Sequence, residues 1–153
     1  MQSLESRSDR RCLLLAASPA EVFAAIRDPG RVARWWGPVG FSNTIHCFDF
    51  VAGGHWRLTM HGPDGRDYPN ESRFLEIEAD RRVVIEHVSG HHFVLTLELV
   101  PEGDGTWVEW QQSFDTREHY ESLAAFVATA NQQNLERLAV EVLHVPAVAS
   151  CRS

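Results

Sequence analysis

The sequence predicts a two-layer α+β fold, in which a curved antiparallel sheet of about seven strands is covered by one long C-terminal helix. Two observations predict it. From residue 41 to residue 114, apolar and polar residues alternate with a period of two, in segments separated by turn residues. Residues 116–144 then contain no glycine or proline and carry apolar residues at helical spacing. A helix of this length, about 42 Å at about 1.5 Å per residue, can cross a whole sheet.

A strand and a short helix are expected near the N-terminus. Residues 10–17, RRCLLLAA, form a short apolar run that suits a strand. Ser18 can cap a helix, Pro19 suits its first position, and Glu21 completes a capping box. The apolar residues that follow at helical spacing are Val22, Phe23 and Ile26. This pattern predicts a strand followed directly by a short helix.

A second short helix contains two adjacent tryptophans. Asp28 provides its cap and Pro29 its first position, while Gly37 and Pro38 end it. Its apolar residues, at i, i+3 and i+4, are Val32, Trp35 and Trp36. This spacing predicts a two-turn helix with its apolar mass on one face.

Six further strands and the long helix complete the order of elements. The strands are expected over residues 41–50, 54–61, 68–78, 82–88, 91–100 and 106–114, separated by the turn segments AGG, GPDG, EAD, SG and EGDG. Their spacing predicts consecutive antiparallel hairpins. The helix expected over 116–144 is the only element large enough to cover one face of such a sheet.

Length and composition indicate one domain over residues 10–145, between flexible ends at 1–9 and 146–153. The net charge of −7 argues against a nucleic-acid surface, which needs clustered Lys and Arg. No signal peptide or apolar run of about 20 residues is apparent, so we expect no membrane insertion. The three cysteines, Cys12, Cys47 and Cys151, lie far apart without metal-ligand spacing, which indicates reduced thiols in a cytoplasmic protein.

Three segments carry a resemblance to a known superfamily. They are ASPAEVFAAIRDPGRVARWWGPVGF at 17–41, AGGHWRLTMHGPDG at 52–65 and LERLAVEVL at 135–143. With this order of elements the chain resembles the START-like, helix-grip superfamily (SRPBCC, the polyketide-cyclase and pollen-allergen fold). It is most similar to the family of homologues of the activator of the ninety-kDa heat-shock protein ATPase, over about residues 10–145. The resemblance implies a sheet wrapped round the last helix and a cavity between the two, closed at one end by the short helices.

The resemblance also gives expectations for single residues. Trp35 is expected to be a core anchor, whereas Trp36 is either a second core anchor or a plug at the closed end of the cavity. Many relatives carry a Gly-Trp pair where this chain has Ala130 and Asn131. If Asn131 faces inward, a small amide replaces a large ring, which leaves more room and one hydrogen-bonding group. The substrates of relatives are therefore not expected to transfer to this chain.

Hairpin registers predict which side chains face inward. Around the EGDG loop the expected pairs are Leu99 with Val108, Leu97 with Trp110, Leu95 with Gln112 and Phe93 with Phe114. This face is apolar except for Gln112, so it is expected to be buried. Across the preceding turn Arg73 meets Glu86, on the face that carries Leu75, Ile77, Val84 and Val88. Arg73 and Glu86 either line a polar end of the cavity and orient a ligand carboxylate or hydroxyl, or form a partly wet structural salt bridge.

The histidines do not form a convincing metal site. His91 and His92 are adjacent on a strand and point to opposite faces. The remaining pair, His87 and His92, is expected on the outer face of the sheet without a clear third ligand. No nucleophile elbow or phosphate-binding loop is present, and Cys47 is expected in the core. We therefore expect no metal and no cofactor.

The function that these residues favour is binding of a hydrophobic or lipid-like small molecule between the sheet and the last helix. The expected apolar lining is Trp36, Trp56, Leu58, Met60, Phe93 and Trp110, and the expected polar groups are Arg73, Glu86, Gln112 and Asn131.

Two alternatives stay open. One is a cofactor-independent cyclase or dehydratase (lyase) that uses Glu86 as its acid or base. The other is an interaction protein that modulates a chaperone ATPase, which the family name suggests. It is the weakest, because the sequence offers no companion domain and no evident basic or apolar stripe for that partner. The sequence leaves open whether an exposed sheet edge pairs into a homodimer.

Overall fold

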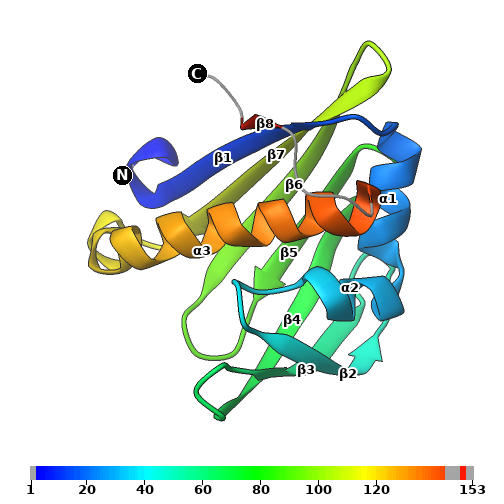
Figure 1. Cartoon of the computed structure of the whole chain (residues 1–153). Coiled ribbons are helices and arrows are strands. Elements are labelled where there is room, and N and C mark those ends of the chain that lie inside the picture. Colours follow the sequence, from blue (N-terminus) through cyan, green and yellow to red (C-terminus); the bar gives the residue numbers. More distant parts are fainter. Residues whose placement is uncertain (1–2, 144–148, 151–153) are drawn as a thin grey trace.

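A computed structural model of the chain describes residues 3–143 and 149–150. Its elements are η1 (Glu5–Arg7), β1 (Ser8–Leu15), α1 (Pro19–Arg27), α2 (Pro29–Trp35), β2 (Ser42–Phe48), β3 (His55–His61), β4 (Asp67–Glu78), β5 (Arg82–His87), β6 (Phe93–Glu102), β7 (Gly105–Phe114), α3 (Arg117–Leu143) and β8 (Ala149–Ser150). All neighbouring strands are antiparallel, in the order β2-β3-β4-β5-β6-β7-β1-β8. The predicted α+β architecture of seven long strands and one long helix is confirmed (Figure 1).

The two short helices begin at the residues that the sequence predicted. In α1 the Ser18 hydroxyl accepts from the Glu21 backbone N–H at 3.2 Å, and the Glu21 carboxylate accepts from the Ser18 N–H at 2.9 Å. The Asp28 carboxylate caps α2 by accepting from the backbone N–H of Gly30 at 2.9 Å. These bonds satisfy backbone donors that the first turn of a helix leaves without partners.

The long helix α3 lies across one face of the sheet, and its C-terminal end is beside α1 and α2 (Figure 1). The side chains of Leu135, Leu138 and Ala139 are completely buried there. The inner faces of the strands supply Leu13, Leu97 and Val108 to the same core. The core is therefore concentrated at the end of the sheet that the short helices close.

One register prediction is confirmed and another is wrong. Strands β6 and β7 pair as expected, with Leu97 opposite Trp110 and Leu95 opposite Gln112. Between β4 and β5 the register shifts by one residue near Leu75, which is exposed. A bulge of this kind reverses the alternation of faces along a strand. The prediction placed Ile77, Leu75 and Arg73 on the same inner face. Because of the bulge, Arg73 lies on the face opposite to that of Ile77.

The ends of the chain differ from expectation. A flexible segment was expected over residues 1–9, but Ser8 and Asp9 are buried residues of β1, opposite Ser113 and Gln112 of β7. At the C-terminus, where a flexible tail was expected over 146–153, Ala149 and Ser150 pair with β1, and residues 146–148 and 151–153 lie outside the described residues.

The state of the cysteines also differs from expectation. Cys47 is free and half-buried, but Cys12 is disulfide-bonded, which contradicts the expectation of reduced thiols throughout. Disulfides are rare in reducing compartments, so the thiols give no support to the predicted cytoplasmic location. Within the part of the chain that the structure describes, no helix combines the length and the apolarity of a membrane span.

Candidate functional site

A cavity of about 550 Å³ lies between the inner face of the sheet and α3, away from the closed end of the core. Its volume is within the range of about 300–1,000 Å³ that is usual for small-molecule sites. The residues that line it are Trp36, Gly37, Pro38, Phe41, Leu58, Met60, Tyr68, Pro69, Asn70, Ser72, His87, Ser89, Gly90, His91, Phe93, Leu95, Trp110, Gln112, Phe126, Ala130, Asn131 and Asn134. None of these lining residues is Asp, Glu, Lys or Arg, so any charge on the cavity wall has to come from a histidine.

The two adjacent tryptophans have different roles. Trp35 is buried in the core, and its indole N–H donates to the Ala25 carbonyl at 3.0 Å, which joins α2 to α1. Trp36 ends α2 in an extended backbone conformation, so its ring lines the cavity instead. Its ring packs edge-on against Trp56, with centroids 4.6 Å apart, and lies 6.1 Å from Trp110. Trp36 is thus the boundary between the packed core and the cavity.

The loop after Trp36 is fastened to α3. The Arg137 guanidinium donates to five backbone carbonyls at 2.7–3.0 Å, those of Arg34, Trp36, Gly37, Pro38 and Phe41. The Asn134 amide accepts from the Gly37 N–H at 3.1 Å and donates to the Trp35 carbonyl at 2.8 Å. Gly37 has φ of +92°, a conformation that favours glycine, and an added Cβ would approach Met60 to 2.9 Å. These contacts hold one wall of the cavity in place.

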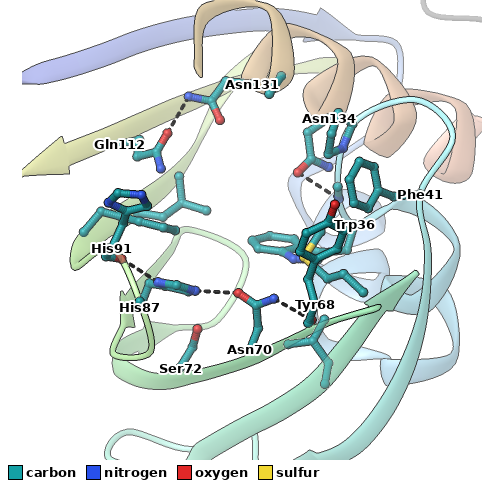
Figure 2. Close-up of a pocket in the computed structure, with 18 of the residues that line it drawn as sticks. Trp36, Phe41, Tyr68, Asn70, Ser72, His87, His91, Gln112, Asn131 and Asn134 are labelled. Atoms are coloured by element: carbon teal, nitrogen blue, oxygen red, sulfur yellow. Dashed lines mark hydrogen bonds between the residues drawn. The ribbon is translucent and has the colours of Figure 1, made fainter. Parts of the chain in front are cut away.

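A buried polar network forms the wall below α3. The Asn131 side-chain N–H₂ donates to the Asp9 carboxylate at 3.0 Å and to the Gln112 carbonyl oxygen at 2.8 Å (Figure 2). Asp9 is also paired with Arg11 at 3.1 Å. Asn131 faces inward as predicted, and it is joined to the one polar residue expected on the inner face of β7. Its amide therefore connects α3 to both β1 and β7.

The opposite wall carries a histidine that the sequence analysis placed elsewhere. His87 lies opposite Phe93 on the inner face, with Nε2 2.6 Å from the Asn70 Oδ1 and Nδ1 2.7 Å from the His91 carbonyl (Figure 2). The Asn70 N–H₂ donates to the Tyr68 carbonyl at 2.9 Å, which fixes the orientation of the amide. Burial lowers the pKa of His87 below its ordinary value, so the ring is neutral near pH 7.

This histidine has two acceptors and, when neutral, one proton to donate. Both neighbouring atoms of His87 are oxygens that only accept, whereas a neutral imidazole carries a single N–H. Only one of the two contacts can therefore be a hydrogen bond at a time. The arrangement leaves the ring able to accept a proton without rearrangement of its neighbours.

Arg73 and Glu86 do not line the cavity, which corrects the sequence-based prediction. They are opposite each other in the β4–β5 register as expected, but both lie on the outer face. The reason is the bulge near Leu75, which reverses the alternation between Ile77 and Arg73. Arg73 is exposed, and Glu86 accepts a hydrogen bond from His92 at 2.9 Å. Glu86 therefore does not face the cavity in which an acid or base role in a cyclase or dehydratase was considered for it.

His92 belongs to the outer face and not to a pair with His87. Its Nε2 donates to Glu86 at 2.9 Å and its Nδ1 donates to Asp115 at 2.8 Å. These hydrogen bonds, first that to Glu86 and then that to Asp115, raise the pKa of His92. Among the residues that the structure describes, no group of three or more His, Cys, Asp or Glu side chains could hold a metal ion.

Most of the predicted lining residues are brought together. Those that line the cavity are Trp36, Leu58, Met60, Phe93, Trp110, Gln112 and Asn131. Trp56 is buried behind Trp36 and does not line it. The sequence analysis missed the polar residues Asn70, Ser72, His87 and Asn134. The bulge hid those on β4 and β5, whereas Asn134 could have been found, because it lies one turn after Asn131 on the same face of α3.

The arrangement suits binding more than covalent chemistry. Apolar rings and aliphatic side chains cover most of the wall, the Asn131 and Gln112 amides carry no charge, and burial keeps His87 neutral near pH 7. Such a surface can exclude water from an apolar molecule and orient it by a few hydrogen bonds. The ring of Phe126, on α3, is 66% exposed and also lines the cavity, so the apolar wall continues to the protein surface there.

Comparisons with solved structures give the same fold. A crystal structure of a protein from Nitrosomonas europaea has a TM-score of 0.83 at 17% identity, covering 94% of this chain and 99% of that one. A solution NMR structure of a protein from Arthrobacter aurescens has a TM-score of 0.84 at 21% identity, covering 95% and 91%. The AHSA1 protein from Silicibacter pomeroyi has a TM-score of 0.72 at 18% identity, covering 90% and 98%. At these identities the likeness shows the fold alone.

The comparison with curated proteins gives no significant match. The family model described as "Activator of Hsp90 ATPase homolog 1-like protein" matches residues 16–142, which is most of the chain and includes both short helices, the sheet after β1 and nearly all of α3. This match confirms the resemblance inferred from the three sequence segments. The chain therefore belongs to the family of Activator of Hsp90 ATPase homolog 1-like proteins, within the SRPBCC, helix-grip superfamily.

Proposed function

We propose that the protein binds a hydrophobic small molecule in the cavity between the sheet and α3. The observation that carries this proposal is the cavity itself: about 550 Å³ with a mostly apolar wall and a few polar side chains at its two ends. Protein cores are ordinarily close-packed, and unfilled apolar volume costs stability. A cavity of this size next to a well-packed core therefore supports a functional use.

The way in which the cavity is kept open supports the same proposal. The Arg137 guanidinium donates hydrogen bonds to backbone carbonyls in and around the loop after Trp36. The Asn134 amide is hydrogen-bonded to the backbone of Trp35 and Gly37, on either side of Trp36. These bonds hold the wall away from Asn131 and His87 in the absence of a ligand. A wall fixed in advance reduces the ordering cost of binding.

Native mass spectrometry of protein purified without denaturation tests the proposal. We expect a mass increment that is released on denaturation, and we expect it to be lost in Asn131→Trp, because the indole would occupy the cavity. Ala130→Phe fills the neighbouring space and leaves the hydrogen bonds of Asn131 intact, so it separates loss of space from loss of the polar network. Arg73→Ala is the matched control on the outer face and should keep the increment.

Two results would contradict the proposal. One is an increment that survives in both cavity-filling variants, since the bound molecule would then lie elsewhere. The other is a protein without any increment whose unfolding temperature does not rise with small apolar probes such as 1-ethylnaphthalene. Ligand that binds only the folded state must raise stability by RT ln(1 + L/Kd), which increases with L, the concentration of free ligand.

A further inference from the structure

The cavity contains a hydrogen-bond donor and an acceptor that lie side by side and have no partner among the residues that the structure describes. Asp9 is a carboxylate that only accepts, so the atom of Asn131 that contacts it is the amide nitrogen. The same nitrogen contacts Gln112, so the contacting atom of Gln112 is its oxygen. The orientation of both amides is thereby fixed by chemistry. What remains on the cavity side is the Gln112 N–H₂ and the Asn131 carbonyl oxygen (Figure 2).

Both groups are open to the cavity, and their residues are otherwise buried, each only 8% exposed. Neither the Gln112 Nε2 nor the Asn131 Oδ1 forms a hydrogen bond with any other residue that the structure describes. A ligand that fills the cavity takes water away from these two atoms, and a polar group that loses water without gaining a partner is costly. A ligand that offers an acceptor to the first and a donor to the second avoids that cost.

The surroundings disfavour an anionic ligand. No Arg or Lys lines the cavity, and the arginine that the sequence analysis expected there, Arg73, lies on the outer face. A carboxylate placed against this wall would face the oxygen of the Asn131 amide, whose nitrogen contacts the Asp9 carboxylate. It would lose its hydration there without gaining an arginine, and burial keeps the His87 ring neutral near pH 7, so its transfer into the cavity is costly.

We propose that the cavity binds uncharged molecules in which an apolar body carries a carboxamide-like group, with the Gln112 N–H₂ donating to its carbonyl oxygen and the Asn131 carbonyl oxygen accepting from its N–H. This inference rests on the proposed function and specifies the ligand class of the same site. A lactam and a protonated carboxylic acid have the same pattern of acceptor and donor. An ester or ketone lacks the donor, and a carboxylate lacks it and adds a charge.

A matched set of three probes tests the inference: 1-naphthylacetamide, 1-naphthylacetate and 1-ethylnaphthalene. Their apolar part is the same and only the polar end differs. In ligand-observed NMR titrations near neutral pH we expect the amide to bind at least about tenfold more tightly than the carboxylate. We also expect the amide to bind more tightly than 1-ethylnaphthalene, and in Gln112→Met this second preference should fall, because the donor to the amide oxygen is removed. Glu86→Gln, on the outer face, should leave both ratios unchanged.

A second measurement on the unchanged protein does not depend on a variant that folds. As the pH is lowered toward the pKa of the naphthylacetate probe, its neutral fraction rises about tenfold per pH unit, and its apparent affinity should rise with it relative to the amide. A carboxylate that binds as tightly as the amide, or a preference for the amide over 1-ethylnaphthalene that Gln112→Met does not change, would overturn the inference and leave the proposed function intact. If none of the three probes binds, the proposed function fails and this inference with it.

Discussion

The two segments of α3 that face the sheet differ in what they cover. Residues 135–143, the packed segment, bury Leu135, Leu138, Ala139 and Val142 against α1, α2 and the strands. Residues 126–134, the roof segment, cover the cavity with Phe126, Ala130, Asn131 and Asn134. One continuous helix therefore stabilises the fold at one end and encloses the candidate binding site at the other.

The difference shows how a helix-grip fold separates stability from binding. The 27 residues of α3 extend beyond the part of the sheet that the short helices close. Where α2 and the ring of Trp35 fill the space between the layers, the helix packs tightly. Beyond Trp36 no such element lies between helix and sheet, and the cavity begins there.

The largest effect is expected from core truncation in the packed segment. Leu138→Ala should lower the free energy of unfolding by about 2–5 kcal/mol, because it removes a completely buried side chain from a close-packed environment. Phe126→Ala in the roof segment should change it by no more than about 0.5 kcal/mol, since that ring is 66% exposed. Urea unfolding followed by tryptophan fluorescence measures both. Equal losses would mean that the two segments are packed alike.

A smaller effect is expected from the ion pair that joins the packed segment to α2. Glu141 accepts from Arg31 at 3.0 Å and from Arg34 at 2.8 Å, and the bond from Arg34 contributes most to lowering its pKa to about 2. A depressed carboxyl pKa stabilises the fold above the ordinary value of 4.5, and this contribution is lost as the pH falls from there toward about 2.

Glu141→Gln should therefore cost about 1–3 kcal/mol near neutral pH and make the stability less dependent on pH in that acidic window. Urea unfolding at a series of pH values measures the difference. Glu136→Gln, one turn away and exposed, is the matched control and should keep the wild-type profile. A Glu141→Gln variant with the wild-type acid profile would show that the ion pair does not fix α2 to the packed segment.

The smallest effect is expected from two histidines on opposite faces of the sheet: His87, which lines the cavity, and His92, which lies on the outer face. The pKa of His87 is lowered by burial, so its contribution to stability is present above the ordinary value of 6.5 and is lost as the pH falls below it. The pKa of His92 is raised by Glu86, so its contribution is present below 6.5 and is lost as the pH rises through the higher value.

Substitution of each histidine by glutamine separates the two contributions. His87→Gln should remove stability loss on the acidic side of 6.5, and His92→Gln should remove the loss on the alkaline side. Each change is limited to the slope of one proton, about 1.4 kcal/mol per pH unit, and solvent screening makes the change for the partly exposed His92 smaller still. The midpoint of thermal unfolding between about pH 5 and pH 8 measures both. Two variants with the same profile would mean that both rings share one environment.

The order of elements and the inner face of the β6–β7 hairpin could be predicted from the sequence. Helix starts depend on caps such as Ser18 and Asp28, which act within a few residues, and the register of β6 with β7 depends on a short loop. Gln112 and Asn131 could be placed inward because regular alternation and helical spacing hold there. These inferences required only local geometry.

The polar wall at His87 could not be predicted in this way. Its position depends on a bulge in β4, and no feature of the sequence near Leu75 marks that extra residue. The same bulge moved Arg73 and Glu86 to the outer face, and with them the expected positive charge of the cavity. A single inserted residue therefore removed the positive partner expected for a ligand carboxylate, and the ligand proposed for this cavity is uncharged.

Periodicity and contacts within a few residues were enough to predict the α+β class, the two capped short helices, the long C-terminal helix and the apolar character of the interior. Tertiary contacts were needed to establish that Trp36 borders a cavity while Trp35 is buried, and that Asp9, Gln112 and Asn131 form one network. These three residues are far apart along the chain. They meet because β1 pairs with β7 and α3 crosses both, and the resulting hydrogen bonds fix which atoms a ligand would encounter.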